Sequence, residues 1–116
     1  MRVQRGDIIL VDYPFSDGTG SKVRPALVVQ SDHLNQKIDD TILASISRAT
    51  HQASATQLAI DLSTPDGKAT GLRQNSMIQC ENLLTYDQSR IIATFGKLTT
   101  TLQQQVDVCL RNALNL

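Results

Sequence analysis

Aromatic residues are scarce in this sequence, which contains two tyrosines, two phenylalanines and no tryptophan among 116 residues. Proteins that hold single-stranded nucleic acid by stacking its bases need a platform of aromatic side chains. The sequence lacks that platform, so any contact with nucleic acid must use phosphates and base edges. Net charge is also absent, because 11 basic residues balance 11 acidic ones. This balance argues against a general polyanion binder, and any anion site must come from locally clustered charges.

Cysteines and long apolar runs are equally sparse. Cys80 and Cys109 are far apart in the sequence and belong to no CxxC or Cys/His cluster, so we expect buried, reduced thiols. No run approaches the roughly 18 apolar residues of a membrane span, and charge returns early at the N-terminus, before a secretory-length segment can form. We therefore expect a cytoplasmic protein with one domain spanning residues 1–116.

Motifs for several common chemistries are missing. The sequence contains no GxxxxGK[ST] loop, no GxGxxG after a strand, and no HExxH, GxSxG or EF-hand pattern. His33 and His51 are the only imidazoles, and neither has a second His or Cys at ligand spacing. We expect no metal site, no cofactor, and surface loop positions for both histidines.

Short strand patterns fill most of the chain. Within residues 39–47, Leu43, Ser45 and Ser47 alternate with apolar neighbours, so that one face of the expected strand ends in hydroxyls. No long helix fits between the strand patterns. Apolar or alternating runs bounded by turn residues define six expected strands, within residues 6–15, 26–30, 39–47, 57–62, 76–87 and 89–98.

Only the C-terminal tail has helical spacing. Thr101 and Gln104 match a capping box at its start. The sequence therefore predicts a mainly β fold, a small and strongly bent antiparallel sheet or barrel closed by a single C-terminal α-helix. The apolar positions that recur at three- and four-residue spacing are Leu102, Val106, Cys109 or Leu110, and Ala113.

The segment "SKVRPALVVQ" places Arg24 directly before an apolar run. Pro25 biases Arg24 toward an extended conformation, so we expect it at the first rung of a strand buried on both faces. Arg24 is then either a surface charge paired to Asp7 or Asp12, or a guanidinium held to meet an anion. The preceding loop, residues 16–22, is rich in glycine and small polar residues, which predicts a mobile hairpin loop.

The order of these segments resembles the MazF/PemK (Kid-like) family of toxins from bacterial type II toxin-antitoxin systems. The matching segments are "RGDIILVDYPF", "GSKVRPALVV", "ILASIS", "GLRQNSMIQCENLLTYDQSRI" and "FGKLT" with the helical tail. The resemblance implies an SH3-like β-barrel that forms a symmetric homodimer and cleaves single-stranded RNA at short sequences without a metal. It also implies a cognate antitoxin that covers the RNA surface, with DNA bound only through the antitoxin complex.

The same resemblance suggests which residues act. Arg24 matches the family's catalytic arginine, and Ser47 falls where the family more often has a threonine. A guanidinium suits the task, because it stays charged and offers a planar fork of donors to phosphate oxygens. Ser47 would add a further donor to the phosphate. The expected substrate-binding residues around this pair are Lys22, Arg48, Asp17, Gln79 and Arg73.

The sequence leaves the proton acceptor and the function class open. The proton acceptor could be Arg24, Asp17 or a water, although the ordinary pKa of arginine makes it a poor base. A non-nuclease poison is possible, because the gyrase-binding CcdB toxins share the barrel. A binding module without cleavage is also possible, because Lys22 stands in a loop, "GTGSKVRP", where the family frequently has Gly-Ser-Glu.

Overall fold

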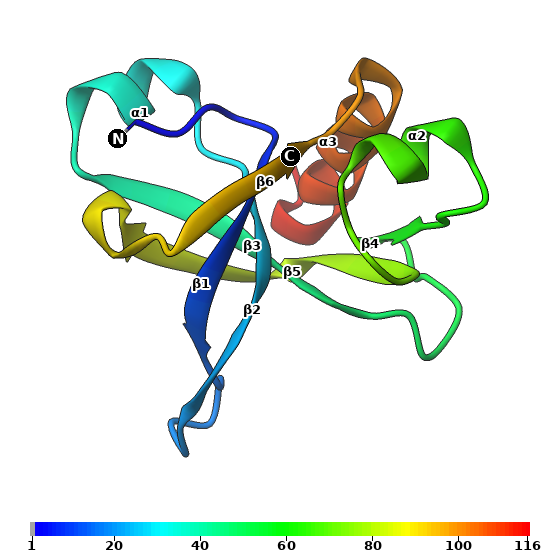
Figure 1. Ribbon diagram of the computed structural model, residues 1–116, viewed down its shortest axis with the longest axis horizontal. Coiled ribbons are helices and arrows are strands. Elements are labelled where there is room, and N and C mark those ends of the chain that lie inside the picture. Colours follow the sequence, from blue (N-terminus) through cyan, green and yellow to red (C-terminus); the bar gives the residue numbers. More distant parts are fainter. Residues whose placement is uncertain (1) are drawn as a thin grey trace.

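A single curled antiparallel sheet of six strands forms the centre of the computed structural model, which describes residues 2–116 (Figure 1). The strand order is β4-β5-β3-β2-β1-β6, so β4 and β6 form the two edges of a half-barrel. The predicted fold class, a bent β-sheet with a C-terminal helix, is confirmed. The strands are β1 (Asp7–Pro14), β2 (Ser21–Val28), β3 (Asp40–Arg48), β4 (Gln57–Ile60), β5 (Ser76–Asp87) and β6 (Ala93–Lys97).

The C-terminal helix α3 (Thr100–Leu114) packs against the sheet through the side predicted from its spacing, with Leu102, Val106 and Cys109 buried. Its predicted capping box is wrong. The N-cap is Thr99, whose hydroxyl accepts a hydrogen bond from the backbone N–H of Leu102, and Thr101 lies inside the helix. The helix therefore begins two residues earlier than the Thr-x-x-Gln pattern indicated.

The expectation of a single helix is also wrong. Two short helices, α1 (Asp32–Lys37) and α2 (Pro65–Ala69), and a 3-10 turn η1 (Gln88–Arg90) lie between strands. Ser31 caps α1 and Thr64 caps α2. Each is too short to show an apolar period, so the sequence around Pro65 indicated only a turn. Among residues 2–116, no helix is long and apolar enough to cross a membrane.

The sheet is buried on both faces by two apolar clusters. The first lies between the sheet and α3 and holds both cysteines, which are buried and free as expected. The second lies on the other face, where Val11, Tyr13 and Ala26 meet. β2 contributes to both, because Leu27 faces the first cluster while Ala26 and Val28 face the second. The prediction of a strand buried on both faces is therefore confirmed for the C-terminal half of β2.

The hairpin of β1 and β2 projects away from the helices (Figure 1). Its register runs from Ile8 opposite Leu27 to Pro14 opposite Ser21. Across the loop, the backbone N–H of Phe15 donates to the carbonyl of Gly20 at 2.8 Å. β2 therefore begins at Ser21, and Arg24 is the fourth residue of the strand instead of the first.

Candidate active site

β2 and β3 are paired along only part of their length. Their ladder joins Val28 to Leu43 and ends where Ala26 lies opposite Ser45. Beyond that point β2 stays paired with β1, and β3 stays paired with β5. The two strands thus splay apart, and each turns an unpaired edge toward the gap between them.

Arg24 and Ser47 face each other across this gap. Each lies two residues beyond the last pair of the ladder, Ala26 and Ser45, on its own strand. Because side chains alternate along a strand, both point to the sheet face on which Ala26 lies. The register therefore brings together the two residues that sequence reasoning placed in the catalytic role.

A cavity of about 210 Å³ occupies the gap. Three cationic side chains and one hydroxyl line it, and none of its lining residues is acidic. A concave site with this composition suits an anion, because clustered guanidinium and ammonium groups favour phosphate oxygens. The lining residues are Lys22, Val23, Arg24, Pro25, Ile46, Ser47, Arg48 and Gln74.

Arg24 has neither of the ion pairs that would make it a simple surface charge. Asp7 lies 3.8 Å from the ammonium of Lys97. Asp12 pairs with Val23 in the β1–β2 register, which places its side chain on the opposite face from Arg24. Among residues 2–116, no carboxylate forms a salt bridge with this half-buried guanidinium, so its charge is free to bind a ligand.

Tyr13 is a buried phenol close enough to Arg24 for the two side chains to interact electrostatically. Burial raises the pKa of Tyr13 to about 12, and the positive charge of Arg24 acts in the opposite direction. The phenol O–H donates to the backbone carbonyl of Asn82 at 3.0 Å. Tyr13 is therefore protonated at neutral pH and supplies neither a counter-ion nor a base.

Ser45 lies behind the Arg24–Ser47 pair on the same face. It is fully buried. Among residues 2–116, its hydroxyl oxygen is the one buried side-chain nitrogen or oxygen atom without a hydrogen-bond partner. The strand also meets an irregularity here, because Ala44 pairs with Leu83 whereas Ser45 pairs with Gln79. The alternation in "ILASIS" placed Ser45 on this face, but sequence reasoning assigned it no role.

Comparison with known proteins identifies the family of this chain. A family model described as PemK-like, MazF-like toxin of type II toxin-antitoxin system matches residues 4–114. The chain belongs to this family. It is 30% identical over 118 residues to endoribonuclease EndoA of Bacillus subtilis (strain 168), covering all of this chain and 97% of that protein. It is 26% identical to endoribonuclease MazF6 of Mycobacterium tuberculosis over 117 residues, which cover both chains completely.

Solved structures share the fold of this PemK/MazF-like chain. A mycobacterial endoribonuclease in complex with its cognate antitoxin superimposes with a TM-score of 0.78 at 21% identity, covering 98% of this chain and 96% of that one. Mycobacterium tuberculosis toxin MazF-mt6 gives a TM-score of 0.74 at 22% identity, covering 97% and 98%. At these identities the likeness establishes the architecture.

The other predicted substrate-binding residues of the PemK/MazF-like chain are distributed unevenly. Lys22 and Arg48 line the cavity with Arg24 and Ser47, whereas Arg73 lines a neighbouring cavity of about 690 Å³ that shares Pro25 and Gln74 with it. Asp17 lies at the hairpin tip outside both cavities, and hydrogen bonds from Thr19 lower its pKa.

Gln79 and Gln74 are the two positions at which the predicted site and the observed cavity differ further. Gln79 also lies outside both cavities, on the sheet between Ser45 and Gln57. Sequence reasoning missed Gln74, which reaches the site from the segment before β5. Nothing in its sequence surroundings distinguishes it. Among residues 2–116, no group of three or more His, Cys, Asp and Glu side chains is placed to hold a metal ion.

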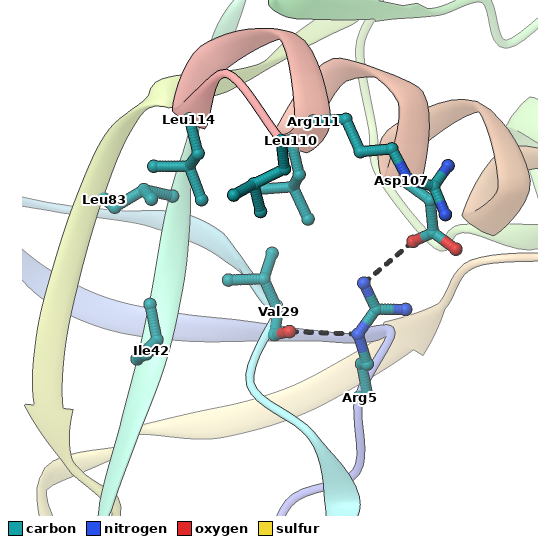
Figure 2. A pocket seen from close by; sticks show the side chains of 9 residues that line it. Arg5, Val29, Ile42, Leu83, Asp107, Leu110, Arg111 and Leu114 are labelled. Atoms are coloured by element: carbon teal, nitrogen blue, oxygen red, sulfur yellow. Dashed lines mark hydrogen bonds and ion pairs between the residues drawn. The ribbon is translucent and has the colours of Figure 1, made fainter.

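An apolar cavity of about 370 Å³ lies beside α3, away from this site (Figure 2). Leu83, Leu110 and Leu114 converge in it. At its rim the guanidinium of Arg5 lies 2.7 Å from a carboxylate oxygen of Asp107. Arg5 differs from Arg24 in this respect, because it already has a carboxylate partner.

Proposed function

We propose that this PemK/MazF-like chain is the toxin of a type II toxin-antitoxin system and acts as a sequence-specific endoribonuclease on single-stranded RNA, without a metal ion. Family membership and the endoribonuclease names of its relatives support the reaction class. The observation that carries the assignment of the site is the cationic gap between β2 and β3, in which unpaired Arg24 faces Ser47. No comparable observation favours a gyrase poison.

The reaction uses the RNA's own 2′-hydroxyl as the nucleophile. The 2′-oxygen bonds to the adjacent phosphorus while the bond from phosphorus to the 5′-oxygen breaks, which leaves a 2′,3′-cyclic phosphate and a 5′-hydroxyl. One proton leaves the 2′-hydroxyl and another reaches the departing 5′-oxygen, so protons balance. Arg24 binds the non-bridging oxygens, where negative charge increases in the transition state. Ser47 donates to the same phosphate.

The candidate proton acceptors at or near the gap are weak bases. The guanidinium of Arg24 offers only N–H donors and no acceptor, and the high pKa of Tyr13 keeps that phenol protonated. Asp17 is ionised, but its lowered pKa makes it a poorer proton acceptor, and it lies at the hairpin tip. In this proposal the 2′-hydroxyl proton therefore passes to water, and Arg24 acts by stabilising charge.

We infer a homodimer that forms over the outer face of β1, β2 and β6. Val23 and Phe95 are large apolar residues exposed on this part of the sheet, by 53% and 40%. The neighbouring cavity, lined by Leu10 and Ala93 among others, shares Pro25 with the cleavage gap. A second copy bound here would place its own gap alongside the first and form one longer RNA surface.

The remaining partners follow from the toxin assignment. The cognate antitoxin inhibits by covering the Arg24–Ser47 gap, and the protein works in the cytoplasm. Contact with DNA occurs only through the antitoxin complex, because the zero net charge of the chain gives it no attraction of its own for duplex DNA.

Cleavage of a single-stranded RNA pool in excess chelator tests the reaction class. We expect cuts at a short recurring sequence, with 2′,3′-cyclic phosphate and 5′-hydroxyl ends. A substrate with 2′-deoxyribose at the cut position should stay intact. Cleavage that needs added Mg²⁺, or that continues at the 2′-deoxy position, would refute the 2′-hydroxyl mechanism. Absence of both RNA cleavage and growth inhibition would refute the function.

A further inference from the structure

A second group of polar side chains lies on the same sheet face as the cleavage gap. In the register of the sheet, Ser45 of β3 is opposite Gln79 of β5, and Gln79 is opposite Gln57 of β4. These residues therefore form a row across three neighbouring strands, and the row starts two residues from Ser47. Gln57 lies about 10 Å from β3, two strand spacings away.

Glu81 lies on β5, two residues after Gln79 of this row, and is the one glutamate in the sequence. It belongs to the segment of β5 between Gln79 and Leu83, where the register with β3 shifts. One carboxylate oxygen accepts a hydrogen bond from the hydroxyl of Thr56 at 2.8 Å, and the other accepts one from the amide of Gln57 at 2.7 Å. The plane of the carboxylate is thereby fixed.

The amide of Gln57 is held from its other end as well. Its oxygen lies 3.2 Å from Nε2 of His51 and accepts a hydrogen bond from the backbone N–H of Ser54 at 3.3 Å. Three segments thus hold the carboxylate of Glu81 in one orientation. They are the loop after β3, strand β4 and the irregular part of β5. Such preorganisation is typical of a recognition group, because little entropy is lost when a ligand binds.

Glu81 is ionised at neutral pH. Partial burial raises its pKa, but hydrogen bonds from Gln57 and Thr56 and the nearby His51 outweigh this effect, so the net pKa is lowered. An ionised carboxylate on the sheet face that carries the phosphate-binding gap repels the RNA backbone. It therefore weakens RNA binding unless it accepts hydrogen bonds from a base.

We propose that Glu81 is a specificity residue of the RNA site and binds the Watson–Crick edge of a guanine that flanks the cleaved phosphate, a role that rests on the proposed function. An ionised carboxylate has about four acceptor positions on its two oxygens, and Thr56 and Gln57 occupy one on each. Guanine offers two adjacent donors, N1–H and the 2-amino group, which match two carboxylate oxygens. Adenine and cytosine offer a single amino group on that edge.

The position of Glu81 fits a flanking nucleotide. The Arg24–Ser47 gap holds the phosphate, and the carboxylate lies across the row of Ser45, Gln79 and Gln57 on the same face. The sequence lacks tryptophan and has few other aromatic residues, so bases cannot be held mainly by stacking. Hydrogen bonds to base edges must then supply the selectivity.

The test compares guanosine with inosine, which lacks the 2-amino group, at the preferred position of the cut sequence. Cleavage of a random single-stranded RNA pool by the wild-type protein first identifies that position. We expect kcat/KM of the wild type to fall about tenfold or more when inosine replaces guanosine there. Glu81→Gln should cleave both substrates at similar rates, because its amide nitrogen cannot accept from the base.

Asp87→Asn is the matched control. Asp87 is the last residue of β5, and its carboxylate is held by a hydrogen bond from the backbone N–H of Ser89. The substitution removes the same charge. This variant should discriminate guanosine from inosine as the wild type does. A wild-type pool with no guanine preference beside the cut, or a Glu81→Gln variant that keeps full discrimination, overturns the inference. Either result leaves RNA cleavage itself intact, so it is distinct from failure of the proposed function.

Discussion

The two halves of the β2–β3 pair differ in both burial and pairing. Where the strands are paired, from Ala26 to Val28, every residue of β2 is buried. Where they splay, from Lys22 to Pro25, the strand carries two cations and lines a cavity. The sheet thus uses one stretch of β2 for stability and the next for binding. A residue in one half should affect stability, and a residue in the other should affect catalysis.

The largest effect on stability is expected in the paired half. Leu27 is fully buried in the cluster beneath α3, so Leu27→Ala should lower the free energy of unfolding by about 2–5 kcal/mol. Val23→Ala, four residues earlier on the same strand and 53% exposed, should change it by less than about 0.5 kcal/mol. Urea denaturation measures both. Equal losses for the two variants would remove the distinction between the halves.

In the splayed half, Ser47 should affect turnover and leave stability unchanged. Ser47→Ala removes a hydrogen bond to the phosphate and should lower kcat/KM about tenfold, whereas Ser47→Thr keeps the hydroxyl and should retain activity. Melting temperatures of both variants should stay near that of the wild type. Equal cleavage rates for Ser, Ala and Thr would make Ser47 a structural residue.

Tyr13 lies opposite Lys22, beside the splayed half, and should affect stability with a pH dependence. Its pKa is raised from 10.0 in the unfolded chain to about 12 in the fold. The contribution is therefore complete below pH 10.0 and is lost as pH rises through about 12. Tyr13→Phe should cost about 1 kcal/mol near neutral pH, through the lost hydrogen bond to Asn82.

Urea denaturation of wild type and Tyr13→Phe across this pH range checks the sign. The difference in unfolding free energy between the two proteins should shrink as pH rises from 10 to about 12, because only the wild type carries the Tyr13 phenol. A difference that stays constant or grows would contradict the assigned direction of the pKa shift.

The smallest effect is expected at the hairpin tip that leads into the splayed half. Gly18 and Gly20 have positive φ values of 76° and 157°, so alanine at both positions strains the loop. We expect slower cleavage with a melting temperature within a few degrees of the wild type. An unchanged cleavage rate would show that Arg24 works in a preformed pocket and that the tip takes no part.

The sequence indicated the main strands and the terminal helix because each has an apolar period long enough to detect. It could not indicate α1 and α2, whose five or six residues are stabilised by the caps Ser31 and Thr64. The alternative pairing of Arg24 with Asp12 could likewise not be decided from the sequence. The register of β1 and β2 excludes it, because the two side chains lie on opposite faces of the sheet.

Part of the candidate site could be predicted from the sequence. Arg24 and Ser47 stand out through their segments and through family resemblance, and the register explains why they meet. Gln74 and Glu81 depend on long-range placement, since a loop and an irregular part of β5 bring them near residues far away in the chain. Local patterns carry no information about such contacts.

The most direct test of the account is the rate of RNA cleavage in chelator by Arg24→Ala, Arg24→Lys and a control, Arg90→Ala. Arg90 stacks on Tyr86 at the other end of the sheet, with its guanidinium carbon 5.2 Å from the ring centroid, so its loss removes the same charge elsewhere. The account predicts a fall of at least about a hundredfold for both Arg24 variants, with the fold intact, because lysine lacks the planar fork. Arg90→Ala should cleave normally. A folded Arg24→Ala variant that cuts RNA at the wild-type rate would contradict the central claim.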